Sequence, residues 1–61
     1  MTDKIIEEIL KVRDTGRTNM FDIYGVQRVA YEKELFDLVI YLEDKDNWGE
    51  YTHFIITGET K

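Results

Sequence analysis

Two arginines and several short polar side chains gather in the stretch RDTGRTNMFD, residues 13–22 of this sequence. The guanidinium groups of Arg13 and Arg17 could hold a phosphate or a carboxylate through paired hydrogen bonds. The side chains that could bond the edges of such a group are Thr15, Thr18 and Asn19. A helix that begins just after the stretch would add affinity for an anion. The stretch is not a glycine-rich phosphate loop, which needs more glycines and an adjacent lysine.

The same stretch can also be explained as a turn between two helices. Gly16 supplies the left-handed conformation that ends helices, and Asp22 is a good N-cap for a following helix. Met20 and Phe21 are then expected to enter the core, while polar residues fill the gap. The turn explains the glycine, the cap and the apolar pair without a ligand. The density of polar donors exceeds what a turn needs, so both interpretations stay open.

Trp48 and His53 are the other side chains that could take part in binding or catalysis. Trp48 lies in the acidic turn DNWGE, where it could be an exposed interface anchor or could fold back over the core. His53 has no oriented acid or nucleophile beside it, so we expect a surface or partly packed histidine. The stretch EDKDNWGE lacks the glutamate that completes a helix–loop–helix calcium site. The sequence therefore predicts no enzyme, no metal site and no cofactor.

Length and composition limit the remaining possibilities. A chain of 61 residues forms one domain, over 1–61, and buries only about 60% of its unfolded surface. It has no cysteine, so a disulfide is excluded, and self-association is the expected source of further stabilisation. The formal net charge of −5 repels phosphate backbones, so nucleic acid is not an expected partner. No apolar run is long enough for a membrane span or a signal core, which predicts a cytoplasmic protein.

Two helices are expected in the first half of the chain. Apolar side chains recur at helical spacing in TDKIIEEILKVRDTG, with Thr2 or Asp3 as the cap. A second helix is expected to start at Asp22 and end near Lys33. Phe21 is placed to pack on Val26 as a hydrophobic staple.

The second half can be interpreted in two ways. LFDLVIYLEDKD and YTHFIITGE suit helices or strands, because short runs rich in β-branched and aromatic residues suit either. The favoured fold class is all-α, a small bundle of three to four short helices that forms a homo-oligomer. The alternative is α+β, with two N-terminal helices and a C-terminal β-hairpin. The predicted core residues are Ile6, Ile9, Leu10, Phe21, Val26, Leu38 and Leu42.

Three stretches carry a resemblance to a known family: ILKVRDTGRTNMFDIYGVQRVA, ELFDLVIYLED and YTHFIITGE. With them the chain resembles very short proteins that are encoded in bacteriophages and prophages of low-GC Gram-positive bacteria and catalogued as a domain of unknown function. The resemblance implies a phage-encoded accessory protein in the host bacterial cytoplasm, and it carries over no activity or site residues. KDNWG looks longer than the family's connection, which argues against one continuous C-terminal helix.

Three functions are compatible with these observations. The first is a protein-interaction module, for example an inhibitor of a host or defence protein, with Trp48 and residues 13–19 as candidate contacts. The second is an oligomer that sequesters an anionic signalling nucleotide through Arg13, Thr15, Arg17, Thr18 and Asn19. The third is a DNA-binding regulator, which is disfavoured because DIYGVQRVAYEKE offers Arg28 and little other positive charge for a recognition helix.

Overall fold

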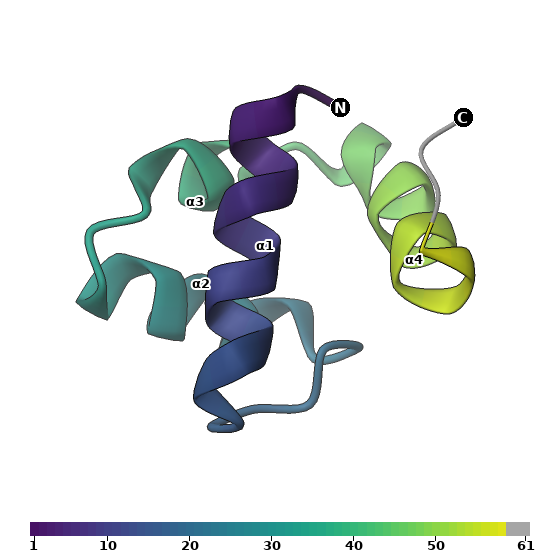
Figure 1. Ribbon diagram of the computed structural model, residues 1–61. Helices are drawn as coiled ribbons and strands as arrows, with labels where there is room; N and C mark the ends of the chain where they lie inside the picture. Colours follow the sequence, from purple (N-terminus) through teal and green to yellow (C-terminus); the bar gives the residue numbers. More distant parts are fainter. Residues whose placement is uncertain (59–61) are drawn as a thin grey trace.

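The computed structural model describes residues 1–58, and these residues are helical with no β-strand (Figure 1). The elements are α1 (Asp3–Thr15), α2 (Ile23–Glu32), α3 (Phe36–Glu43), the short 3₁₀ turn η1 (Lys45–Asn47) and α4 (Trp48–Thr57). The all-α expectation is confirmed, and the alternative with a C-terminal β-hairpin is wrong.

α1 organises the molecule. It runs through the middle of Figure 1, with α2 and α3 on one side and α4 on the other. The buried core draws on all four helices: Ile5, Ile9, Val12, Val26, Val29, Ala30, Leu38, Leu42, Tyr51 and Phe54. Of the predicted core residues, Ile9, Val26, Leu38 and Leu42 are buried, and Ile6 packs against the core while partly exposed.

Leu10 and Phe21 are corrections to the predicted core. Leu10 is 40% exposed because the buried side of α1 follows Ile5, Ile9 and Val12, and Leu10 lies beside that line. Phe21 is 57% exposed, so it does not enter the core as the expected staple on Val26. The physical reason is local, because the Asn19 Oδ1 atom accepts the Phe21 backbone N–H at 2.8 Å and holds Phe21 in an exposed turn.

The ends of α1 follow the sequence signals. The Thr2 hydroxyl accepts the Ile5 N–H at 3.2 Å, and so it is the N-cap. Gly16 stops the helix with φ 63°, and its N–H donates to the Arg13 carbonyl. On the exposed side Lys11 lies 3.5 Å from Glu7, one turn earlier in the helix.

α2 begins at the expected cap and ends by a device that the sequence did not reveal. The Asp22 carboxylate accepts the Gly25 N–H at 3.1 Å. At the other end Glu34 has φ 62°, although it is not a glycine. The Leu35 N–H reaches back to the Ala30 carbonyl at 2.8 Å, and the Glu34 N–H donates to Tyr31 at 3.0 Å. This is the Schellman pattern, with glutamate where glycine is usual.

α3 is capped by a side chain from another helix. Its own N-cap residue, Leu35, supplies no side-chain hydrogen bond. Instead the buried Glu8 carboxylate of α1 accepts the Leu38 N–H at 2.8 Å, with Lys4 Nζ 3.8 Å from its other oxygen. A carboxylate at this end also opposes the positive pole of the helix dipole. Glu8 thus fixes α3 against α1.

The chain turns between α3 and α4 earlier than expected. The predicted turn DNWGE is wrong in its position, since Trp48 already begins α4 and Gly49 lies inside it. The turn is made by Asp44, whose side chain accepts the Asp46 N–H, and by η1. Gly58 ends α4 with φ 74°. No helix among residues 1–58 is both long and apolar enough to cross a membrane.

Candidate functional site

The loop between α1 and α2 uses much of its polarity to hold its own shape. The Thr15 hydroxyl donates to the Val12 carbonyl at 2.6 Å and accepts the Arg17 N–H at 3.2 Å. The Asn19 side chain holds the Phe21 N–H, and the Asn19 carbonyl accepts the Asp22 N–H at 2.9 Å. Two of the five polar candidates, Thr15 and Asn19, therefore have a role in the turn without any ligand.

A buried tyrosine of α4 ties this loop to the core. Tyr51 has no exposed surface, and its hydroxyl donates to the Met20 carbonyl at 2.6 Å. Burial raises the pKa of Tyr51, so the phenol stays protonated and remains a donor. Met20 itself packs against the core. This contact could not be predicted from the sequence, because the two residues are far apart along the chain.

Arg13 lies beside an apolar groove between α1 and α4. The groove has a volume of about 220 Å³ and is lined by Ile9, Leu10, Arg13, Met20, Phe54, Ile55 and Gly58. Ile9 and Phe54 are buried, whereas Leu10 and Arg13 are exposed. Within residues 1–58 the Arg13 guanidinium forms no ion pair. The groove therefore combines an apolar lining with one unpaired cation.

Arg17 belongs to a different depression. Its Nη2 atom lies 2.8 Å from a carboxylate oxygen of Glu32. A polar depression of about 150 Å³ is lined by Arg17, Thr18, Gly25, Arg28, Val29 and Glu32. Within a single chain, Arg13 and Arg17 therefore lie in separate depressions. Arg17 shares its depression with Arg28, a residue that the sequence did not suggest for this site.

Gly25 allows the loop to lie against the start of α2. A Cβ atom at this position would lie 2.5 Å from the Thr18 hydroxyl and 2.6 Å from the capping carboxylate of Asp22. Both distances are far shorter than ordinary van der Waals contact. A side chain here would force the Thr18 hydroxyl and the Asp22 carboxylate to shift, although the position of Gly25 in the first turn of a helix gives no such indication in the sequence.

Trp48 folds back over the core. Its indole N–H donates to the Leu42 carbonyl at 2.8 Å, and its ring meets Tyr24 edge to face at 5.9 Å between centroids. Lys45 Nζ lies 5.8 Å from the same ring, within cation–π range. This geometry matches the interpretation in which Trp48 folds back over the core, and not the one in which it is a fully exposed interface anchor. The half-buried ring still leaves an edge at the surface.

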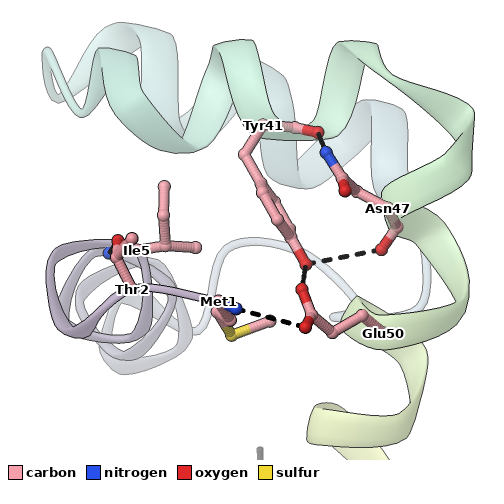
Figure 2. Close-up of polar contacts among 6 residues, drawn as sticks. All are labelled: Met1, Thr2, Ile5, Tyr41, Asn47 and Glu50. Atoms are coloured by element: carbon pink, nitrogen blue, oxygen red, sulfur yellow. Dashed lines mark hydrogen bonds and ion pairs between the residues drawn. The ribbon is translucent and has the colours of Figure 1, made fainter.

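A polar cluster joins α3, the following turn and residue 1 (Figure 2). The Tyr41 hydroxyl donates to the Glu50 carboxylate, whose other oxygen lies 3.1 Å from the Met1 amino group. The Asn47 amide donates to the Tyr41 carbonyl at 2.9 Å. The hydrogen bond from Tyr41, and then the one from Met1, lower the pKa of Glu50.

This cluster ties α3 to α4 and to residue 1. Burial, and then the hydrogen bond to Glu50, raise the pKa of Tyr41. A phenol with a raised pKa stays protonated at neutral pH and so remains a hydrogen-bond donor to Glu50. His53 is half-buried on α4, as the sequence predicted. Among residues 1–58 no three His, Cys, Asp or Glu side chains are grouped closely enough to hold a metal ion.

Comparison with known proteins gives one match. A family model described as Domain of unknown function (DUF5049) matches residues 1–59. The chain belongs to this family. No curated protein and no solved structure matches the chain. The expected resemblance to a domain of unknown function is therefore confirmed, and the family itself brings no activity to the DUF5049 chain.

Proposed function

We propose that this DUF5049 chain acts by binding another protein through the groove between α1 and α4. The observation that carries the proposal is a groove that holds an exposed Leu10 beside the Arg13 guanidinium, which forms no ion pair within residues 1–58. Apolar anchors that enter pockets, together with arginine, dominate the binding energy of protein interfaces.

The size of the groove favours a protein segment over a small molecule. Its volume of about 220 Å³ is below the roughly 300–1,000 Å³ of pockets that enclose small ligands. A space of this size accepts one or two apolar side chains. Arg13 adds a fork of donors suited to a carboxylate. The proposed partner therefore presents an apolar side chain next to an aspartate or glutamate.

The biological setting is proposed from the resemblance. In that setting the chain is a phage- or prophage-encoded accessory protein of the bacterial cytoplasm, and the partner is a host or defence protein that it inhibits. A small binding protein needs no catalytic machinery, so we propose no enzymatic activity. The negative net charge of −5 supports a protein partner over DNA, and a DNA-binding regulator ranks last.

An anionic ligand is the second candidate function, and a specific observation supports it. The depression beside Arg17 and Arg28 holds two guanidinium groups, the residue type that binds phosphate best. Glu32 already occupies Arg17 at 2.8 Å, so an anion would have to displace it. The depression is also small for a whole nucleotide, so a signalling nucleotide would need a second chain to complete the site.

Capture from a lysate of a low-GC Gram-positive bacterium tests the first candidate. The immobilised wild-type chain is compared with Leu10→Glu and Arg13→Glu by quantitative mass spectrometry. Lys11→Glu is the matched control, because Lys11 is equally exposed on α1 but lines a different depression. We expect a protein that the wild type and the control capture and that both groove variants lose. Equal capture by all four chains would refute the groove.

Thermal shift with a panel of cyclic di- and trinucleotides tests the second candidate. A rise in melting temperature that Arg17→Ala and Arg28→Ala abolish, and that Arg13→Ala leaves in place, would support the anionic ligand. No rise with any nucleotide of the panel counts against it and leaves the protein partner as the function.

A further inference from the structure

The α2–α3 hairpin carries a second apolar surface, on the side away from the core. On α2 it follows Tyr24 and Tyr31, seven residues apart and therefore on one helical face. On α3 it follows Phe36 and Ile40, one turn apart. These four side chains are 68%, 66%, 47% and 65% exposed, respectively. We call this surface the outer face.

The two stripes of the outer face adjoin each other. The rings of Tyr31 and Phe36 meet edge to face, with centroids 5.6 Å apart. At the middle of the hairpin the Gln27 side chain donates to the Val39 carbonyl at 3.0 Å. The buried residues of α2 and α3, such as Val26 and Leu38, lie on the opposite sides of these helices. The two stripes of the outer face therefore lie side by side and touch at the Tyr31–Phe36 end of the hairpin.

Each stripe includes one charged residue, which lies on the same helical face as the apolar residues. Arg28 lies between Tyr24 and Tyr31 on α2, whereas Glu43 follows Ile40 by three residues on α3. Both charged side chains are exposed, and within residues 1–58 neither forms an ion pair. The α2 stripe therefore carries a positive charge, and the α3 stripe carries a negative one.

We propose that a second copy of this chain covers the outer face, in a dimer with a two-fold axis parallel to α2 and α3. In that arrangement α2 of each protomer lies against α3 of its partner. Tyr31 of one protomer meets Phe36 of the other, since the two residues are at the same end of the hairpin. The symmetry repeats every contact, as an isologous interface requires.

Charge complementarity selects this arrangement. At a rise of 1.5 Å per residue, Arg28 of one protomer lies about 6 Å along the helix axis from Glu43 of its partner, within reach of an arginine side chain. The dimer forms this pair twice. A dimer in which α2 packs on α2 would instead place Arg28 against Arg28 and leave both glutamates unpaired.

The size of the outer face sets the expected affinity. With roughly 150–250 Å² for a whole aromatic side chain, the exposed parts of these groups sum to about 400–500 Å² per protomer. Two protomers would bury about 900 Å² of this apolar surface, below the roughly 1,200–2,000 Å² of stable interfaces and in the range of weak ones. We therefore expect a dimer that dissociates in the micromolar range. The dimer does not depend on the groove between α1 and α4, which lies on other helices.

Analytical ultracentrifugation over a wide concentration range tests the dimer. The mass of the wild type is expected to rise with concentration from one chain to two. Ile40→Glu should remain a monomer at every concentration. Ile56→Glu is the matched control, because Ile56 is the same residue type and 68% exposed but lies on α4. This control should dimerise like the wild type.

Charge exchange tests the pairing of α2 with α3. Arg28→Glu and Glu43→Arg should each weaken the dimer at least tenfold, because each sets like charges together. An equimolar mixture of the two variants should form a heterodimer, since residue 28 of each variant then meets the opposite charge at residue 43 of the other. A wild-type monomer at all concentrations, a dimeric Ile40→Glu, or a mixture that stays monomeric would overturn the proposal. Circular dichroism of each variant shows that it is folded.

Discussion

Single atoms decide several features of this small domain, and Gly25 is the clearest case. The glycine lies in the first turn of α2, where alanine would normally be preferred by about 1 kcal/mol. The missing Cβ instead leaves room for the Thr18 hydroxyl and for the Asp22 carboxylate that caps the helix. The loop and the helix therefore meet in this arrangement because residue 25 has no side chain.

Gly25→Ala should fail to stabilise the protein. Because the new methyl group must displace the capping carboxylate, a loss of about 1 kcal/mol offsets or exceeds the gain in helix propensity. Gly49→Ala is the matched control, since a Cβ there has nothing within 4 Å, and it should raise the free energy of unfolding by up to about 1 kcal/mol. Urea denaturation measures both. Equal gains for the two variants would contradict the role of Gly25.

Among the secondary-structure elements, the helix ends show how much the sequence could reveal. Gly16 and Asp22 mark helix ends by chemistry that acts within a few residues, and both were predicted correctly, while Thr2 was one of two candidate caps for α1. Glu34 ends α2 in a conformation that glycine usually adopts, so the sequence contained no visible stop. Local signals were sufficient where the cap and the helix are neighbours in the chain.

The candidate site was harder to predict, because its residues come from parts of the chain that are far apart in sequence. Arg13 and Arg17 are four residues apart, but the end of α1 lies between them and directs them into separate depressions. The prediction that Leu10 is buried was wrong, because helical periodicity does not reveal which neighbouring helix covers which side. The groove exists only through the position of α4, which is set by long-range contacts such as Tyr51 to Met20.

Glu34→Gly should stabilise the chain. A left-handed conformation costs a residue with a side chain roughly 1–2 kcal/mol, and glycine avoids that cost while losing part of the gain to its greater freedom when unfolded. We expect a net gain of up to about 1 kcal/mol in thermal unfolding. Lys33→Gly, one residue earlier at φ −94°, is the control and should destabilise the chain. A loss of stability in Glu34→Gly would show that the glutamate side chain has a role of its own.

Glu8→Ala should release the start of α3. The Leu38 N–H would lose its acceptor, and the removal of such a cap costs about 1–2 kcal/mol. Glu8→Gln keeps an acceptor oxygen but not the charge that opposes the helix dipole, so its loss should be smaller. Amide hydrogen exchange at Leu38 reports the contact directly. If Leu38 exchanged equally fast in the wild type and in Glu8→Ala, Glu8 would not be the cap.

At the scale of the whole molecule, the chain gains cohesion from polar groups that link its distant parts. Glu8 joins α1 to α3, the phenol of Tyr51 joins α4 to the loop before α2, and the Tyr41–Glu50 contact joins α3 to α4. A chain of 61 residues buries too little apolar surface to have a large margin of stability. Its stability should therefore respond measurably to the ionisation of the two tyrosines, Tyr41 and Tyr51.

Above pH 10 the free energy of unfolding should fall. The pKa of Tyr51 and that of Tyr41 are raised in the folded chain, whereas the unfolded chain ionises both near the ordinary value of about 10. Below that pH both states bind the proton and the full stability is present. As the pH rises further, only the unfolded state loses the proton, and each tyrosine lowers stability by about 1.4 kcal/mol per pH unit.

Tyr51→Phe isolates the buried tyrosine. At neutral pH it should cost about 1–2 kcal/mol, because the Met20 carbonyl loses its donor. Above pH 10 its stability should fall less steeply than that of the wild type, since one of the two raised tyrosines is gone. Tyr31→Phe is the control for removal of a phenol hydroxyl, because Tyr31 is 66% exposed, and at neutral pH it should change the free energy of unfolding by less than about 0.5 kcal/mol. Denaturant unfolding at pH values from 7 to about 11 measures the free energy of unfolding of each variant. Equal slopes above pH 10 for Tyr51→Phe and the wild type would show that the Tyr51 phenol ionises as readily in the folded chain as in the unfolded one.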